Sequence, residues 1–586
     1  MKFAELVDVF EKLESTTKRL EKTTLVADFL VKVPKTLIGK TILLLNGRVF
    51  PNWDEREIGI SDKLVLRAIS IATGVSQSEV ESLWKNLGDL GKVAERCIAN
   101  KKQSTLFSLP LTISKVFDNL QKVASVEGEG SVDMKLKLVA ELLTNAKPKE
   151  ARYVVRIVLG DLRLGVGEGI IRDAIVWACF KDRIGFEYDE EKNELVFSDA
   201  DGRQKYNEYV ELVQRVFDLT NDFSVVAEKC FAGEDALRNT TVEIGKPLKV
   251  MLFQKAKDIE DGFSVVGKPC ACEYKYDGFR LQIHKKGQKI WLYTRRLENV
   301  TKQFPDVVSV VRDCIKADNF ILDAEVIGFD PKTGKWLPFQ RISHRIKRKY
   351  GIAEMTKEVP VIVNVFDAVM VDGKILIDVP FSERRKLIEK IIVEEKNKIG
   401  VAKQIIADSV EEVECFYKES LKLGNEGIMM KNLSAPYKPG SRVGYGVKLK
   451  PVMETLDLVI VGAEWGEGKR TNWLSSFVLA CRDSNGNLLT IGKMGTGIKE
   501  KSEEGVSFEQ LTKLLTPLIL EEKGKEVKIK PSVVVEVSYE EIQKSPTYSS
   551  GFALRFPRFV RIRNDKSVLE ISTIEDVKRL FNEQRS

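Results

Sequence analysis

Apolar residues recur at helical spacing through the first part of the chain. One such helix begins near the N-terminus, and its apolar face consists of Phe3, Leu6, Val7, Phe10 and Leu13. A second predicted helix has an apolar stripe made of Met134, Leu138 and Leu142, with Leu143 on the adjoining stripe. Clusters of Gly, Ser and Pro separate these helices, and runs typical of strands are few before about residue 245. The pattern predicts a helical domain at the N-terminus.

The pattern changes from helix to strand near Gly245–Lys246–Pro247. The next predicted strands cover residues 281–284, 289–294, 320–329 and 361–365. The turn at 285–288 joins the first two strands as a hairpin. These strands predict a second domain that is built around a sheet.

A third region of short strands follows Pro451. They cover residues 456–461, 477–480, 488–493 and 533–538. Their spacing suits a small β-barrel such as an OB-fold. The chain closes with a predicted helix whose start resembles a capping box, and the residues concerned are Thr573 and Asp576 at the cap and Val577, Leu580 and Phe581 on the apolar stripe.

Composition adds limits to this picture. The 586 residues predict roughly three or four domains, and 43% hydrophobic residues are enough for packed cores. The net charge of +7 is mildly basic, which makes nucleic acid a plausible partner without proving one. No run of about eighteen apolar residues and no signal-peptide layout occurs, so we expect a cytoplasmic protein with no membrane partner.

The cysteines and histidines exclude several kinds of site. Eight cysteines are scattered without a CxxC pair, which argues against a zinc site and against a disulfide framework. The two histidines, His284 and His344, lie on different predicted elements, so a histidine-based metal site or triad is not expected. Any metal would be a hard ion that carboxylates bind.

The segment Cys272–Arg280 is the strongest candidate for chemistry. It is predicted to be a short strand that leads into a turn at Gly278, where glycine permits a tight bend. Because side chains alternate along a strand, Glu273, Lys275 and Asp277 share one face. Two acids on either side of a lysine fit a lysine that is held ready for reaction. The same segment also fits a surface strand with a ladder of charges, and the rest of the chain has to decide.

Further charged and aromatic residues occur in the predicted strands of the middle region. They are Arg295 and Arg296, Asp323 and Glu325, Phe366 and Asp367, Glu426, and Lys448 and Lys450. Each alone is typical of a solvated face. Together they supply cations for phosphates, carboxylates for Mg²⁺, an aromatic ring for a base and a lysine nucleophile. The set favours nucleotide chemistry.

One segment of the helical part fits contact with DNA. The loop Gly160–Gly169 places Arg163 among glycines, which allow a backbone to approach a phosphate closely or let the arginine enter a minor groove. A plain turn between two helices is the simpler interpretation of this loop.

A second segment of the helical part fits contact with a protein. In Lys101–Phe107, the residues Gln103, Leu106 and Phe107 resemble the short peptide that docks on sliding clamps. An exposed apolar pair there would need a pocket on a partner. The pattern is short and also occurs by chance.

The order of the motifs resembles the ATP-dependent DNA ligases of the archaeal and eukaryotic replicative type, and most of all those of archaea. The matching segments, in the family's order, are Lys275–Gly278, Thr294–Thr301, Asp323–Glu325, Asn364–Asp367, Glu426–Lys431, Lys448–Lys450 and Leu554–Phe559. A single short match is weak, but several in one order are strong. The resemblance covers nearly the whole chain.

The resemblance implies a multidomain fold and a substrate. We expect an all-α DNA-binding domain over residues 1–238, an α+β nucleotidyltransferase (adenylation) domain over 239–449 and a β-barrel OB-fold domain over 450–586. It also implies a monomer that seals nicks in duplex DNA during replication, repair and recombination. A sliding clamp then becomes a better-supported partner for Gln103–Phe107, and Arg163 becomes a better-supported DNA contact.

The resemblance also implies roles at the nucleotide. Lys275 attacks the α-phosphorus of ATP, releases pyrophosphate and carries AMP; nearby cations help it to lose its proton first. Glu273 accepts a hydrogen bond from the adenine amino group, and Phe366 stacks on adenine. The other implied contacts are Arg280 and Arg295 at the ribose and phosphate side, Glu325 and Glu426 at Mg²⁺ (or Mn²⁺) and the ribose, Arg442, Lys448 and Lys450 at the nucleotide phosphate, and Arg555 and Arg558 at pyrophosphate.

Two positions depart from the family pattern, and other functions stay open. Gly446 stands where many relatives have tryptophan, and Val250 stands where many have proline; neither replaces a reacting group. An mRNA capping guanylyltransferase or an RNA ligase shares the lysine core, but has no need of the long helical part. A DNA- or clamp-binding scaffold without catalysis would need no such set of charged motifs. An NAD-dependent ligase is disfavoured because its cysteine cluster is missing.

Overall fold

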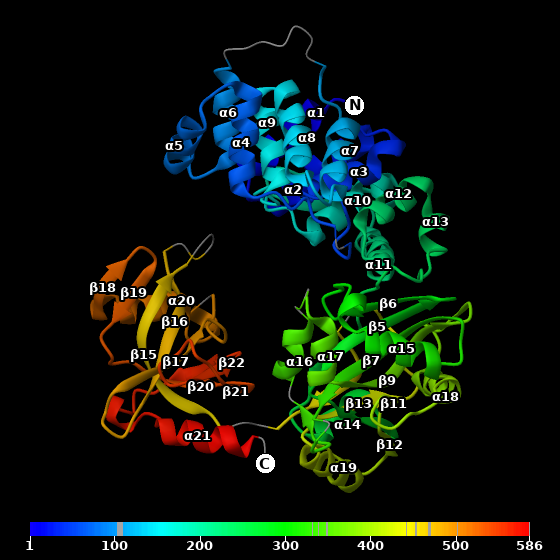
Figure 1. Cartoon of the computed structure of the whole chain (residues 1–586), viewed down its shortest axis with the longest axis vertical. Helices are drawn as coiled ribbons and strands as arrows, with labels where there is room; N and C mark the ends of the chain where they lie inside the picture. The colour runs from blue at the N-terminus through cyan, green and yellow to red at the C-terminus, as the bar shows by residue number, and fades with distance from the viewer. Residues whose placement is uncertain are drawn as a thin grey trace. The chain divides into compact units, whose positions relative to one another are not determined.

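The computed structural model of the chain forms two compact units. These are Met1–Val410 with Met429–Lys448, and Glu411–Ile428 with Leu449–Ser586 (Figure 1). The structure describes all residues except Glu55, Pro331, Pro338, Lys347, Lys349, Ser441, Thr471, Lys501 and residues 102–108, 452–453, 467–469 and 585–586. The predicted domain boundaries at residues 238 and 449 divide the chain differently and stay predictions.

Residues 1–238 are helical, as the apolar spacing predicts. α1 (Phe3–Ser15) buries all five residues of its predicted face. A short hairpin of β1 (Phe186–Asp189) and β2 (Glu194–Phe197) is inserted after α10. The other helices are α2 (Arg19–Lys32), α3 (Ile38–Leu45), α4 (Asp62–Thr73), α5 (Gln77–Leu87), α6 (Leu90–Ala99), α7 (Ile113–Ser125), α8 (Ser131–Asn145), α9 (Pro148–Val158), α10 (Glu168–Ile184), α11 (Gly202–Thr220), α12 (Phe223–Ala232) and α13 (Glu234–Arg238).

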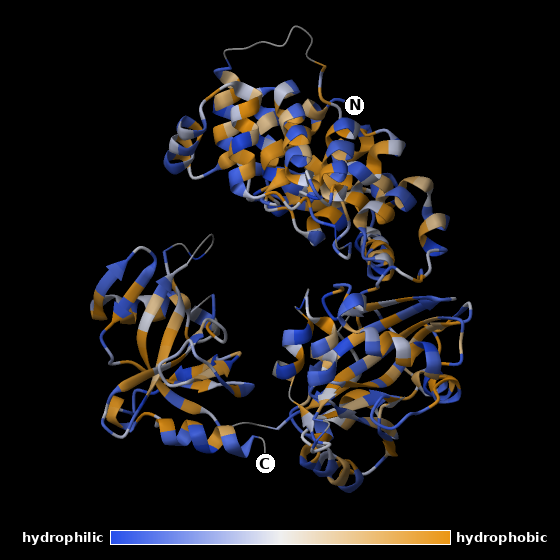
Figure 2. Cartoon of the chain, viewed as in Figure 1, coloured by the Kyte–Doolittle hydropathy of each residue, from blue (hydrophilic) through white to orange (hydrophobic). Residues whose placement is uncertain are grey.

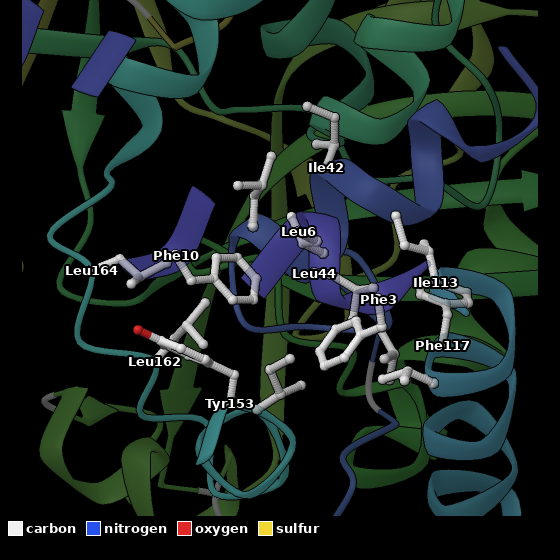
Figure 3. Packing of buried hydrophobic residues seen from close by; sticks show 14 of the residues in the cluster. Phe3, Leu6, Phe10, Ile42, Leu44, Ile113, Phe117, Tyr153, Leu162 and Leu164 are labelled. Carbon is white, nitrogen blue, oxygen red and sulfur yellow. The ribbon is translucent and has the colours of Figure 1, made fainter. Parts of the chain in front are cut away.

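The core of this helical part gathers around α1. Figure 3 shows Phe3, Leu6 and Phe10 of α1 among side chains from α3, α7 and α9. The rings of Phe10 and Tyr153 lie 5.0 Å apart. Leu162 and Leu164, from the loop after α9, are buried in the same core. The loop is therefore anchored to the helices through its apolar side chains.

The predicted face of α8 is wrong in part. Met134 is exposed and Leu138 is half-buried, whereas Leu142 and Leu143 are buried as predicted. The helix carries apolar residues on two adjoining stripes, so spacing alone does not select the buried one. The neighbours α4 and α7 pack against α8 and make that selection.

The middle of the chain forms two sheets and covering helices. The seven-stranded sheet has the order β10-β9-β7-β5-β6, with β11 on β9 and β8 on β7; the five-stranded sheet has the order β12-β4-β13-β14-β3. The strands are β3 (Leu252–Lys255), β4 (Cys270–Lys275), β5 (Phe279–Lys286), β6 (Lys289–Thr294), β7 (Asn319–Phe329), β8 (Trp336–Leu337), β9 (Val361–Val371), β10 (Lys374–Ile375), β11 (Ile399–Val401), β12 (Gln404–Ala407), β13 (Gly427–Asn432) and β14 (Arg442–Leu449). The helices are α14 (Ile259–Val266), α15 (Pro305–Cys314), α16 (Phe339–Ile346), α17 (Ile352–Glu358) and α18 (Phe381–Ile391).

The predicted hairpin is confirmed, and its polar residues hold the chain that leads into the sheets. β5 and β6 pair antiparallel from Leu281–Thr294 to Lys286–Lys289. The N–H of Gly245 donates to Nδ1 of buried His284 at 3.0 Å, so Nε2 of His284 carries the proton and donates to Gln282 Oε1 at 3.1 Å. The N–H of Leu248 also donates to Gln282 Oε1, at 3.1 Å. Residues 245–248 are thus fixed on β5.

The second unit is built on a sheet with the order β17-β16-β15-β19-β18, in which β20 joins β15 to β23. Within the ranges that the structure describes, this pairing leaves β17 and β18 at the ends of the order, so a closed barrel is not found. The predicted capping box of the last helix is confirmed at Thr573 and Asp576. The elements are α19 (Val410–Lys422), β15 (Leu456–Trp465), β16 (Leu474–Arg482), β17 (Leu488–Met494), α20 (Phe508–Leu515), β18 (Ile519–Lys523), β19 (Glu526–Ile529), β20 (Val534–Ser538), β21 (Glu541–Lys544), β22 (Phe552–Arg555), β23 (Arg558–Ile562) and α21 (Ile574–Glu583).

Hydropathy follows these elements. In Figure 2 the strands of the large sheets are rich in hydrophobic residues, whereas the side of α21 that faces the viewer is hydrophilic. Among the described helices, none is both long enough and apolar enough to span a bilayer.

Candidate active site

β4 ends at Lys275, where the sequence predicts the end of a strand. Glu273 is only 2% exposed, and the four other residues of β4 before Lys275 are buried as well. A surface ladder of charges is therefore wrong for this strand, because a solvated face does not bury its acid. Lys275 is half-buried and lies two residues beyond Glu273, on the same face of the strand.

Gly278 is required by a close approach between strands. A Cβ atom placed there would lie 2.4 Å from the carbonyl oxygen of Val326 and 2.9 Å from Cγ2 of Ile327, both on β7. Its φ is not among the positive values of the chain. The chain bends at Gly278, as predicted, and glycine is also needed there because no side chain fits.

Asp277 belongs to the turn between β4 and β5. Its Oδ2 accepts a hydrogen bond from the backbone N–H of Phe339 at 3.4 Å. Phe339 is the first residue of α16, so the carboxylate lies at the N-terminus of a helix, where negative charge is favoured. Asp277 thus ties the turn beside Lys275 to α16.

Glu273 is held from three sides. Its Oε1 accepts from Gln404 Nε2 at 2.9 Å and lies 3.4 Å from Nη1 of Arg385. Its Oε2 lies 2.5 Å from Nζ of Lys431, which is 5% exposed. Gln404 and Lys431 come from β12 and β13, the strands on either side of β4, and Arg385 comes from α18. The buried carboxylate therefore has cationic partners, as a buried charge requires.

Phe366 is placed by a β-bulge in β9. Asp323 and Ala324 of β7 pair with Asp367 and Val365, which leaves Phe366 as the extra residue of β9. A bulge of this kind turns a side chain toward a site next to the sheet. The ring of Phe366 lies 5.2 Å from the guanidinium of Arg280 and 4.8 Å from Nζ of Lys431. The spacing of the sequence did not show the bulge.

Arg280 is bound to Asp323 of the seven-stranded sheet and to the carbonyl oxygen of Met251, which precedes β3. Its Nη2 lies 2.6 Å from Oδ2 of Asp323, which is fully buried and also accepts from the Tyr437 hydroxyl at 2.5 Å. Burial alone would lower the pKa of Arg280, but the charge of Asp323 outweighs it and raises that pKa above its ordinary value. Burial and the same carboxylate raise the pKa of Tyr437 well above its ordinary value. The guanidinium is thus a fixed cation beside Phe366.

Arg295 and Glu325 lie next to Arg280 along the sheet. Glu325 of β7 is directly opposite Arg280 and is half-buried. Arg295 is exposed and follows Thr294, which pairs with Leu281. Arg280, Glu325 and Phe366 therefore come from β5, β7 and β9, which are neighbouring strands of the seven-stranded sheet. Arg295 directly follows β6, and Glu273 lies on β4 of the five-stranded sheet.

Two of the predicted phosphate and metal residues pair with each other in the second unit. Lys450 Nζ lies 2.9 Å from Glu426 Oε2 and 3.5 Å from Glu540 Oε2. Burial alone would lower the pKa of Lys450, but Glu426 and then Glu540 raise it above its ordinary value. Lys448 is half-buried near the end of β14. The side chain of Arg442 lies outside the described residues.

The last predicted motif lies on β22 and β23. Arg555 Nη1 donates to Glu541 Oε2 at 3.2 Å, and Arg558 is exposed at the start of β23. Phe556, between them, has a φ of 52° and a side chain that is 66% exposed. The turn therefore presents Arg558 and an aromatic ring to solvent.

Arg163 lies in the connection between α9 and α10, as a turn between helices predicts. Its φ is 57°, it stands between buried Leu162 and Leu164, and its Nη1 lies 3.7 Å from Oδ2 of buried Asp89. Arg163 is half-exposed and lies 2.6 Å from Asp161. The loop lines a pocket of about 510 Å³ with Leu45 and Asn46. Gln103, Leu106 and Phe107 lie outside the described residues.

The donor set for a metal ion is small. In the part of the chain that the structure describes, no group of three or more His, Cys, Asp or Glu is arranged to hold a metal. Asp323 is engaged by Arg280 and Tyr437, and Glu325 lies two residues further along β7 on the same face. Mg²⁺ is bound through one or two carboxylates together with substrate phosphates, so this donor set suits it.

Four residues of the site were not predicted from the sequence. Lys431, Arg385, Gln404 and Tyr437 complete the shell around Glu273 and Arg280. Lys431 stands in the recognised segment Glu426–Lys431, which is a signal that was available. Nothing in the local sequence identifies the other three, because they reach the site from separate elements.

Three regions of the chain match families of known proteins. Residues 250–450 match the ATP dependent DNA ligase domain, residues 2–176 match the DNA ligase N terminus, and residues 470–566 match the ATP dependent DNA ligase C terminal region. A DNA ligase of Nanoarchaeum equitans is 49% identical over 589 residues, which cover 100% of this chain and 99% of the relative. A DNA ligase of Thermococcus fumicolans is 44% identical over 586 residues, with 100% and 99% covered. A solved structure named Pmar-Lig_Pre has the same fold, with a TM-score of 0.53 at 16% identity, and covers 95% of this chain and 99% of that one.

Proposed function

The chain belongs to the ATP-dependent DNA ligases, and from this membership we propose that Lys275 is the residue that carries AMP during nick sealing. The observation that carries the proposal is the buried shell at the end of β4. Lys431 contacts both Glu273 and Phe366, and Phe366 in turn contacts Arg280. Glu273 lies on β4, two residues before Lys275. Nucleotidyl transfer needs a hydrogen-bond acceptor for the base, an aromatic ring that stacks on it, a cation for phosphate and a lysine nucleophile.

The reaction proceeds by three displacements at phosphorus. The neutral amine of Lys275 attacks the α-phosphorus of ATP, a P–N bond forms, and pyrophosphate leaves while the amine loses a proton. A 5′-phosphate oxygen at the nick then displaces the lysine and takes AMP. The 3′-hydroxyl attacks the phosphorus of the 5′-phosphate, loses its proton, and releases AMP as the strand is sealed.

The nucleotide contacts follow the positions of the side chains. Glu273 accepts from the amino group of adenine, and Phe366 stacks on the base. Arg280 and Arg295 serve the ribose and phosphate side, where Arg280 is already a fixed cation. The remaining proposed contacts are Arg442, Lys448 and Lys450 at the α-phosphate and Arg555 and Arg558 at pyrophosphate.

Glu325 and Glu426 are the residues that we propose for Mg²⁺, with Mn²⁺ as an alternative ion. When bound, such a cation neutralises phosphate charge and orients the leaving group. Glu426 pairs with Lys450 at 2.9 Å, so its carboxylate has to exchange that partner for the ion. This exchange supports a role for Glu426 in only some steps of the reaction.

The domain boundaries and the DNA contacts are part of the proposal. The helical domain covers residues 1–238 and binds duplex DNA with Arg163, the adenylation domain covers 239–449, and the C-terminal domain over 450–586 is an OB-fold. The half-exposed guanidinium of Arg163 supports the DNA contact. The enzyme acts as a monomer in replication, repair and recombination.

Gln103, Leu106 and Phe107 form the proposed contact with a sliding clamp. Phe107→Ala is expected to weaken binding to a sliding clamp by at least about tenfold, because the ring is the largest apolar group of the peptide. Surface plasmon resonance measures the affinity, and nick sealing without clamp serves as the control. Unchanged clamp affinity would remove this partner.

The function is tested by covalent labelling. Incubation with α-labelled ATP and Mg²⁺ is expected to label the wild-type protein, and nicked duplex DNA is expected to remove the label as the nick is sealed. Lys275→Ala abolishes the label, whereas Lys286→Ala, at an exposed lysine of the β5–β6 hairpin, keeps it. A labelled Lys275→Ala protein would contradict the nucleophile, and DNA binding without any label would favour a scaffold.

A further inference from the structure

Lys431 contacts both groups that are proposed to read the base. Its Nζ lies 2.5 Å from Oε2 of Glu273 and 4.8 Å from the ring centre of Phe366. The ring of Phe381 lies 4.6 Å from the same nitrogen, so the ammonium is placed by two aromatic rings and one carboxylate. Lys431 is only 5% exposed, so it is a buried residue of the site and not a surface lysine.

The contacts of Glu273 leave few of its hydrogen-bond acceptor positions for a ligand. An ionised carboxylate has about four acceptor positions on its two oxygens. Gln404 and Arg385 use Oε1, and Lys431 forms an ion pair with Oε2. A donor from the base would have to reach Oε2, the oxygen whose charge Lys431 balances.

Lys431 is the cation that fixes Oε2 of Glu273. Arg385 is 3.4 Å from Oε1 and also bonds Glu389 at 2.7 Å, so Lys431 is the nearer cation. Lys431 also contacts the ring of Phe366, so it holds Oε2 beside the ring that is proposed to stack on the base. A carboxylate oxygen held there accepts a hydrogen bond from a base and does not donate one.

We propose that Lys431 is a positioning residue that sets the preference of the nucleotide site for a purine with an amino group at C6 over a purine with an oxo group there. The proposal rests on the function given above, in which Glu273 reads adenine. An amino group donates to the ionised Glu273. An oxo group would face that carboxylate with an acceptor of its own and leave both unsatisfied.

Two substitutions remove the charge of Lys431 in different ways. Lys431→Met keeps the length of the side chain against Phe366 and Phe381, and Lys431→Gln keeps a hydrogen-bond donor. In both, Oε2 of Glu273 loses the ammonium that holds it beside Phe366, so the preference for ATP over inosine triphosphate is expected to fall by at least about tenfold. Lys431→Arg keeps the charge and is expected to keep most of the preference.

A buried lysine elsewhere in the same part of the chain provides the matched control. Lys285 is 8% exposed, donates to the carbonyl oxygen of Ala317 at 2.9 Å and lies 5.7 Å from the ring of Phe320. Lys285→Met removes a buried ammonium of the same kind but leaves Glu273 unchanged. It is expected to lower the unfolding temperature and to leave the nucleotide preference as it is.

The experiment measures the rate of covalent labelling by α-labelled ATP and by α-labelled inosine triphosphate across nucleotide concentrations. The ratio of the two kcat/KM values gives the preference, and thermal unfolding shows which variants are folded. A lower ratio in the folded charge-removing variants, with Lys285→Met unchanged, supports the role of Lys431. An unchanged ratio in either charge-removing variant that folds, or an equal drop in Lys285→Met, overturns it. If wild-type protein takes no label from ATP, the proposed function itself fails, which is a separate outcome.

Discussion

Gly278→Ala tests whether the turn after Lys275 is fixed by steric contact. The added Cβ atom would lie 2.4 Å from the carbonyl oxygen of Val326, although such contacts essentially never fall below 3.0 Å. Val326 belongs to β7, which pairs with Phe279 of β5 on one side and with Val363 of β9 on the other. A central strand that is held on both sides cannot move away, so the turn has to shift by about half an ångström.

Two effects of this shift are measurable. Overpacking of this kind lowers the free energy of unfolding by about 1–3 kcal/mol. Displacement of the strand that carries Lys275 also lowers the rate of AMP transfer, by about tenfold to a hundredfold, because reacting groups tolerate little misplacement. Urea unfolding and the initial rate of labelling by α-labelled ATP measure the two effects.

Gly444→Ala is the matched control for this substitution. Gly444 lies on β14, and its nearest neighbour for an added Cβ is Cγ1 of Val265 at an ordinary 3.7 Å. Both the stability and the labelling rate of this variant are expected to stay close to the wild type. If Gly278→Ala behaves like Gly444→Ala in both assays, the contact with Val326 does not constrain the turn.

Three further predictions concern a histidine, a buried ion pair and the DNA loop. Burial lowers the pKa of His284 to about 3. As the pH falls below about 6.5, the unfolded chain therefore binds the proton first, and the free energy of unfolding drops by up to about 1.4 kcal/mol per pH unit. Urea unfolding near pH 5 and pH 7 should show a smaller drop in the free energy of unfolding for His284→Gln than for the wild type. Asp367→Ala leaves the guanidinium of Arg384, 1% exposed, without the carboxylate that binds it at 2.7 Å, and is expected to lower the free energy of unfolding by about 3–5 kcal/mol; a loss below about 1 kcal/mol in urea would refute this. Arg163→Ala is expected to weaken binding to duplex DNA of any sequence, and to lower by about one the slope of log affinity against log salt concentration, both measured by fluorescence anisotropy. Arg183→Ala, at an exposed arginine, should change neither the affinity nor the slope.

Local patterns predicted the elements whose partners are close in sequence. The β5–β6 hairpin and the capping box of α21 need only a few neighbouring residues, and both are confirmed. The exposed Met134 shows the limit, because two apolar stripes on one helix are separated only by the helices that pack against it. The order of the sheet strands is likewise set by pairing between distant segments.

The motif residues were predicted better than the contacts among them. Phe366 stands in a recognised segment, and Glu273 and Arg280 flank another, Lys275–Gly278; the structure links the three through Lys431 and the ring of Phe366. The bulge at Phe366 depends on a register with β7, some forty residues earlier, that no local pattern encodes. The charge partners Arg385 and Lys431 are set by burial of Glu273, which becomes visible only when the strands on both sides of β4 are known.

The anchoring of Leu162 and Leu164 has a consequence for the entropy of binding. Ordering a free loop costs about 1–2 kcal/mol for each backbone residue, and this cost would weaken any complex that the loop forms. Here folding of the helical core has already fixed the backbone around Arg163, down to its φ of 57°. A ligand therefore has to immobilise only one side chain, at a cost of up to about 2 kcal/mol, and most of the interaction energy of the guanidinium is retained as affinity.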